Sequence, residues 1–143
     1  MAHSKLGTLL QIVSQAAGEI GIVQRPVNAV VDSSDQDIKH MQYLLSAVAM
    51  EVTEEEPYLT TLGTGDWIID SETGELKTVF DKDTDLVAFD RRLAINGVKW
   101  RFLASKGLEF GEQQRDFITR LNKLASRANA RVLDLDIEWG RVQ

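Results

Sequence analysis

The sequence has no cysteine, which excludes disulfides, thiolate metal sites and cysteine nucleophiles together. It has two histidines, His3 and His40, and no spacing of serine, histidine and aspartate that would indicate a catalytic triad. No stretch approaches the roughly 20 apolar residues that a membrane-spanning helix needs. The first residues also lack the long apolar run of a signal peptide, so we expect the protein to stay in the cytoplasm where it is made.

The sequence patterns that come nearest to a metal-binding or phosphate-binding site are incomplete. The aspartates of residues 81–85 alternate as in a calcium-binding loop, but Leu86 occupies the position of the required glycine and Arg92 that of the required glutamate. They are expected to be turn and cap residues ahead of a helix. The glycines at 63 and 65 precede a strand rather than a helix, so they do not form a phosphate-binding loop. The sequence therefore predicts no enzyme, with no catalytic residue, metal or cofactor.

Length and charge indicate one domain with two oppositely charged halves. The 143 residues are enough to bury a single core, and the 43% hydrophobic content is typical of a globular chain. Residues 1–90 carry 16 acidic and five basic side chains, whereas residues 91–143 carry six and eleven. Such halves pair either within the chain or head-to-tail between copies. The net charge of −6 argues against a nucleic-acid binder, which would usually be basic overall.

Two helices are predicted in the first part of the chain. Over residues 6–20, apolar side chains recur at the spacing of one helix face, and Gly21 provides a helix stop. A second helix is expected to begin at Ser34, because Ser34 followed by Asp37 approximates a capping box. Its end is the acidic run 54–56 before Pro57, where carboxylates oppose the helix dipole. This run is either a solvated helix end or a docking site for a basic neighbour.

Strands and two more helices follow. Residues 66–80 read as a β-hairpin, with Gly74 placed for a positive φ in the turn. A helix over residues 91–105 is apolar almost all the way round, so it must be buried, and Gly107 ends it. The last helix, residues 112–131, has one apolar stripe and one basic stripe. The basic stripe is either a solvated edge or an interaction surface.

The C-terminal residues alternate strictly between apolar and acidic side chains from 133 to 139, which is the period of a strand with one apolar face. No other segment obviously pairs with such a strand, so we expect it to pair with a hairpin of its own chain or, preferably, with another chain. The apolar residues expected to make this contact with the other chain are Leu133, Leu135, Ile137 and Trp139.

The predicted fold class is therefore mainly α. It is a four-helix bundle with an inserted β-hairpin and an extended C-terminal tail. A helical domain would cover residues 1–131, with the hairpin inserted at about 66–80, and the tail would cover residues 132–143.

Several short motifs resemble the tail-tubular-A-like family of head–tail adaptor (connector) proteins of tailed bacteriophages. They are the sequence AAGEIG at 16–21, SDQD at 34–37 and LL at 44–45, an acidic run leading into LAINGVKWR at 93–101, then ASKGL at 104–108 and EQQRDF at 112–117. Their order and spacing, over about residues 6–130, carry the resemblance.

The resemblance implies a structural virion protein of the phage neck, made in the host cytoplasm. About twelve copies would form a ring on the portal protein, extend the DNA channel and join the tail or the next neck protein, with genomic DNA passing through without sequence-specific binding. No membrane is involved. Opposite charges would then meet between copies. The expected intersubunit charge contacts are Glu54, Glu55, Glu56, Arg120, Lys123, Arg127 and Arg131.

The alternative is a small nucleic-acid-binding regulator, in which the last two helices form a helix-turn-helix pair and the basic stripe faces phosphates. Against it, the basic residues lie late in the second helix, whereas such proteins contact bases from its N-terminal end. A stand-alone protein-interaction module is a third class. Salt-dependent duplex binding would favour the regulator, and concentration-dependent rings would favour the adaptor.

Overall fold

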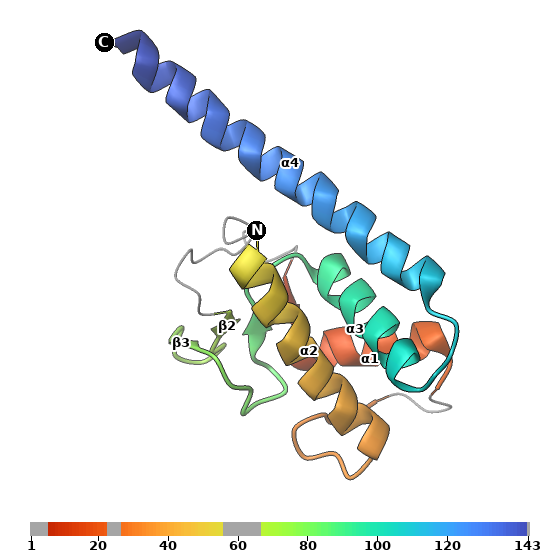
Figure 1. Cartoon of the computed structure of the whole chain (residues 1–143). Helices are drawn as coiled ribbons and strands as arrows, with labels where there is room; N and C mark the ends of the chain where they lie inside the picture. The colour runs from red at the N-terminus through yellow and green to blue at the C-terminus, as the bar shows by residue number, and fades with distance from the viewer. Residues whose placement is uncertain (1–5, 23–26, 56–66, 143) are drawn as a thin grey trace.

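The computed structural model describes the backbone of residues 6–22, 27–55 and 67–142, and the side chains of these residues except 55 and 128–142. Its helices are α1 (Leu9–Ile20), α2 (Gln36–Glu55), α3 (Arg91–Ser105) and α4 (Gly111–Val142) (Figure 1). Its strands are β1 (Gly7–Thr8), β2 (Ile68–Ile69), β3 (Leu76–Lys77) and β4 (Leu86–Val87). The predicted mainly α class is confirmed. Within the described residues, no helix combines the length and apolar character needed to cross a membrane.

Helix α3 is the centre of the fold and packs against α1, α2 and α4. All six of its residues from 93 to 98 are buried, as predicted from its apolar composition. Gly97 allows α2 to come close, because a Cβ there would lie 2.7 Å from a methyl group of Val48. Trp100 is partly buried, beside Phe110 and Phe117. Lys106 and Gly107 end the helix as predicted, with Gly107 at φ +70°.

The first helix is shorter than predicted because a strand precedes it. Residues 7–8 form β1, and Thr8 then caps α1 in a reciprocal capping box with Gln11. The apolar face of α1 is buried at the predicted spacing. Gly21, at φ +75°, ends the helix as expected.

The start of α2 differs from the prediction by one residue. The Asp35 carboxylate, rather than the Ser34 hydroxyl, accepts hydrogen bonds from the backbone N–H groups of Asp37 (2.9 Å) and Ile38 (3.4 Å). Serine and aspartate are about equally good caps, so the local sequence alone does not select one.

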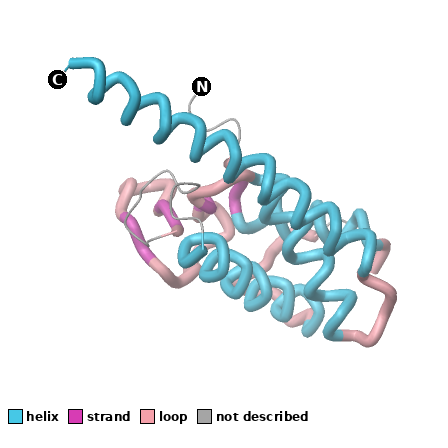
Figure 2. Tube along the Cα trace, turned by 45° about the horizontal axis from the view of Figure 1, so that its top comes forward, coloured by secondary structure: helices cyan, strands magenta, loops and turns pink. Residues whose placement is uncertain are grey.

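The predicted hairpin is confirmed, but it belongs to a larger antiparallel sheet of order β1-β4-β2-β3. The strands are magenta in Figure 2. Ile68 of β2 lies opposite Lys77 of β3 on one side and opposite Val87 of β4 on the other. Gly74 adopts φ +74° in the turn. Strands β1 and β4 were not predicted, because two-residue segments carry no readable period.

The prediction of an extended tail with a strand over 133–139 is wrong. Helix α4 continues without a break across residues 131 and 132 and ends at Val142. A helix satisfies its backbone hydrogen bonds within the segment, whereas a lone strand cannot. The residues from 132 to 139 include no proline or glycine, and Val132, Leu135 and Trp139 also have helical spacing.

Candidate functional site

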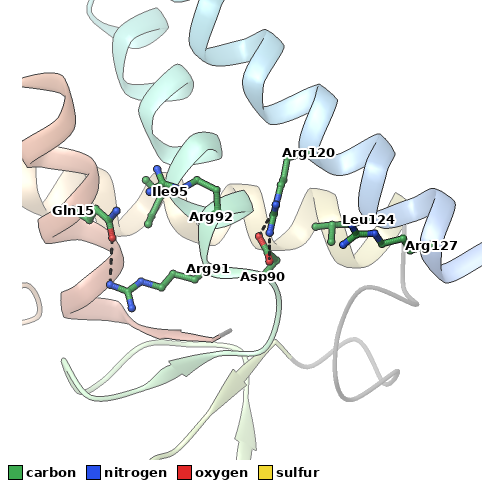
Figure 3. A pocket seen from close by; sticks show the side chains of 8 residues that line it. All are labelled: Gln15, Asp90, Arg91, Arg92, Ile95, Arg120, Leu124 and Arg127. Carbon is green, nitrogen blue, oxygen red and sulfur yellow. Dashed lines mark hydrogen bonds and ion pairs between the residues drawn. The ribbon is translucent and has the colours of Figure 1, made fainter. Parts of the chain in front are cut away.

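An arginine-lined pocket of about 490 Å³ opens where three helices meet. One wall is α1, the floor is the start of α3, and the other wall is the middle of α4 (Figure 3). Its four arginines come from two separate stretches of sequence, 91–92 and 120–127, so only the fold gathers them. The lining residues, called the arginine pocket below, are Gln15, Asp90, Arg91, Arg92, Ile95, Arg120, Leu124 and Arg127.

Asp90 organises the floor of the arginine pocket. Its carboxylate caps α3 by accepting a hydrogen bond from the Leu93 N–H at 2.9 Å. The same carboxylate accepts two hydrogen bonds from Arg120 of α4, at 3.0 Å from Nε and 2.8 Å from Nη2. This bidentate pair raises the pKa of Arg120 above its ordinary value. Asp90 therefore joins the start of α3 to the middle of α4.

Arg91 and Arg92 point to different partners on α1. The Arg91 guanidinium donates to the neutral amide oxygen of Gln15 at 3.2 Å. Gly7 leaves room for the Arg91 side chain, because a Cβ at Gly7 would lie 3.0 Å from its Cγ. Arg92 donates to both carboxylate oxygens of Glu19, at 3.0 and 3.1 Å.

Glu19 is a shared acceptor beside the arginine pocket. Lys99 donates to the same carboxylate at 2.8 Å. Partial burial raises the pKa of Glu19, but the hydrogen bonds from Lys99, Arg92 and Gln15 together outweigh burial and lower it to about 2. Glu19 therefore stays ionised at neutral pH and neutralises part of the positive charge.

The arginine pocket keeps an excess of positive charge, with four arginines and one aspartate in its lining. Within the described part of the chain, Arg91 and Arg127 form no ion pair with a carboxylate. Guanidinium groups bind carboxylates and phosphates through two parallel N–H donors, which gives such a pocket a preference for anions. Leu124 and Ile95 add apolar surface. The arrangement can bind an acidic group, and it presents no nucleophile with an adjacent base.

A second group of charged side chains lies beside the sheet, and its carboxylates and ammonium groups pair with one another. Carboxylate oxygens of Asp70, Asp81 and Asp85 lie within 4.8 Å of one another. The Lys77 ammonium forms ion pairs with all three, at 3.4 Å from Asp70 and 2.8 Å from Asp85. Lys82 forms a further pair with Asp70 at 3.0 Å. We call these five residues the lysine–aspartate cluster.

Hydrogen bonds explain why the aspartates of residues 81–85 alternate. Asp83 Oδ1 accepts hydrogen bonds from the backbone N–H groups of Val30 and Val31 and so attaches the loop to the segment before α2. Asp85 Oδ2 accepts from the N–H groups of Asp81 and Lys82. The expectation that these aspartates shape a turn is confirmed. The cap of α3, however, is Asp90.

The structure places the predicted charge contacts in three groups. Arg120 has an intrachain partner, Asp90, which the sequence did not indicate. Glu54, Lys123 and Arg127 are exposed. The contacts that lie outside the described side chains are Glu55, Glu56, Arg131, Leu133, Leu135, Ile137 and Trp139.

Sequence reasoning missed Asp90, Arg91 and Arg92 as site residues. Asp90 could have been found, because an aspartate three residues before Leu93 at a predicted helix start is a capping signal. The convergence of Arg91 with Gln15 has no local signal, since the two residues are 76 positions apart. Comparison with protein-family models, curated proteins and solved structures gives no match to this chain.

Proposed function

We propose that the chain is a structural virion protein, a head–tail adaptor whose copies form a ring on the portal of a tailed bacteriophage. The ring extends the DNA channel and joins it to the tail or to the next neck protein. The proposal rests on the family resemblance of the motifs and on one structural observation, the projecting end of α4.

Helix α4 has 32 residues, whereas α3, on which it packs, has 15. Its C-terminal part runs beyond the other helices and the sheet (Figures 1 and 2). A helix gains most of its stability from packing an apolar face. The spacing of Val132, Leu135 and Trp139 continues such a face along this part. A projecting helix of this kind is suited to contact another chain.

The same helix argues against the nucleic-acid regulator. In a helix-turn-helix protein, the N-terminal residues of the second helix contact base edges. Here, Glu112 and Asp116 are exposed at that end of α4 and would repel phosphates. Arg120 is already paired with Asp90. The basic stripe is therefore weaker as a phosphate-binding surface than its sequence indicates.

The deciding experiment is electron microscopy of the purified protein with and without a phage portal. We expect rings on the portal, and we expect a variant that lacks residues 132–143 to remain a folded helical protein but to lose stable docking. Circular dichroism of the truncated variant checks its folding. Normal portal binding by the truncation would contradict the role of the α4 end.

A duplex-binding assay separates the two function classes. The adaptor proposal predicts no tight duplex binding at any salt concentration. Affinity for duplex DNA that falls steeply with increasing salt, together with an absence of rings on any portal tested, would favour the regulator instead.

A further inference from the structure

Among the described residues, the arginine pocket has more cationic groups than carboxylate partners. Asp90 pairs with Arg120, and Glu19 pairs with Arg92. Within the part of the chain that the structure describes, Arg91 donates to the neutral amide of Gln15 and pairs with no carboxylate, and Arg127 is exposed beside Leu124 (Figure 3). Like charges gathered in a concave site repel one another unless an anion enters. The pocket is therefore built to receive carboxylates or phosphates from outside the chain.

We propose that the arginine pocket binds the acidic C-terminal segment of α4 from a second copy of this chain. The binding residues of that segment are Asp134 and Glu138. This inference rests on the proposed function, because it assigns the contact that joins neighbouring copies in the ring.

The segment cannot reach the pocket of its own chain. Arg120, Leu124 and Arg127 line the pocket from α4, and the same helix continues to Val142. At a rise of 1.5 Å per residue, Asp134 lies about 10 Å beyond Arg127 along the axis. Glu138 lies about 16 Å beyond it. An unbroken helix cannot turn back over this distance, so this segment can enter the pocket only from another chain.

The chemistry of the segment matches that of the pocket. On a helix, Asp134 and Glu138 are four residues apart and share a face. Two carboxylates on one face can pair with two guanidinium groups through parallel hydrogen bonds. The segment also carries apolar residues, which suit the apolar surface that Ile95 and Leu124 contribute. Duplex DNA offers phosphates but no apolar side chains, so the pocket favours a peptide.

The geometry of this contact favours a ring. The pocket and the segment are different surfaces of the same molecule, so each copy would give one segment and receive another. Such heterologous contacts close into a ring when the rotation between copies permits, and otherwise form an open filament. The contact thus explains how the two oppositely charged surfaces could meet between copies.

Charge reversal of the full-length protein tests the pairing. The pocket variant is Arg91→Glu with Arg127→Glu, and the segment variant is Asp134→Lys with Glu138→Lys. We expect each variant alone to lose at least about tenfold in self-association, measured by sedimentation velocity at low ionic strength, where screening is weak. We expect an equimolar mixture of the two variants to recover association, because each then meets its complement.

Matched controls separate this pairing from a general effect of charge. Arg115→Glu with Lys106→Glu changes the net charge by the same amount as the pocket variant, at exposed positions outside the pocket. We expect this control to associate like the wild type. If the pocket variant fails to fold, as judged by circular dichroism, Arg127→Glu alone replaces it, since Arg127 is exposed.

Several results would overturn the inference. The wild type could stay monomeric at all accessible concentrations, or the pocket variant could associate like the wild type. The mixture of the two variants could also fail to recover self-association. Duplex DNA that binds the wild type but not the pocket variant would identify phosphates as the occupant instead. Portal rings formed equally well by both variants would refute this contact and leave the adaptor function standing. If the mixture recovers association but the wild type does not bind the portal, the contact between copies would stand and the adaptor function would be refuted.

Discussion

The lysine–aspartate cluster and the arginine pocket both concentrate like charges, but they differ in how these charges are balanced. In the cluster, Lys77 and Lys82 lie among three aspartates, and each carboxylate has an ammonium partner. In the pocket, arginines outnumber carboxylates, and Arg91 and Arg127 form no ion pair within the described part of the chain. The cluster is internally complete, which fits a structural role. The pocket is incomplete, which fits binding.

The two charged sites also differ in how deeply their side chains are buried. The Asp85 side chain is fully buried and the Asp70 side chain is 10% exposed, whereas Arg127 is exposed. Hydrogen bonds from Lys82 and from the backbone N–H groups of Glu72 and Thr73 lower the pKa of Asp70 below its ordinary value. Removing a partner from the cluster should therefore cost stability, whereas removing a pocket arginine should cost binding.

The largest expected effect is that of Lys77→Met. The substitution keeps most of the side-chain volume but leaves the buried carboxylate of Asp85 without its ammonium partner. Breaking a buried ion pair from one side is strongly destabilising, and we expect the melting temperature to fall by more than about 5 °C. Lys77→Arg, which keeps the charge, is the control. A methionine variant that melts like the wild type would show that the cluster is not structural.

The next effect is that of Asp90→Ala, which removes both the α3 cap and the partner of Arg120. Loss of an N-cap alone costs about 0.5–2 kcal/mol, so we expect a decrease of about 1–2 kcal/mol in the free energy of unfolding, measured with urea. Asp90→Asn keeps the cap acceptor and should lose less. Equal losses in the two variants would indicate that the ion pair with Arg120 dominates.

A smaller effect on the free energy of unfolding is expected when the pH is lowered far enough to protonate Glu19. The pKa of Glu19 is about 2 in the folded chain, compared with 4.5 ordinarily. Because the folded pKa is the lower one, the stability that Glu19 contributes is present above about pH 4.5 and is lost as the pH falls through about 2. We expect Glu19→Gln to flatten the pH dependence of unfolding in this window by up to about one proton. The exposed residue Glu112 provides the control substitution, and an unchanged slope would contradict the assignment.

The smallest expected effect on stability is that of Arg127→Met. Arg127 is exposed, and exposed surface substitutions usually change stability by less than about 0.5 kcal/mol. We expect an unchanged melting temperature together with weaker self-association. A large loss of stability would mean that the arginine pocket is structural, like the lysine–aspartate cluster.

The sequence by itself determined the mainly α class, the helix over residues 91–105, the hairpin with Gly74 and the stops at Gly21 and Gly107. These features depend on local periodicity, turn chemistry and the freedom of glycine to adopt positive φ, all of which act over a few residues. The same local reasoning wrongly predicted a strand in the projecting part of α4. Alternation over seven residues fits a strand, but a segment without a pairing partner satisfies its backbone only as a helix.

Only the tertiary structure decided the sheet order and the composition of the two charged sites. Strands β1 and β4 pair although they lie far apart in the sequence, and two residues are too few to show a period. Lys77 meets Asp85, Arg91 meets Gln15 and Asp90 meets Arg120 because packing around α3 brings their elements together. Charge pairing depends on distances of a few ångströms, and those are fixed by the packing of the whole chain rather than by any local pattern.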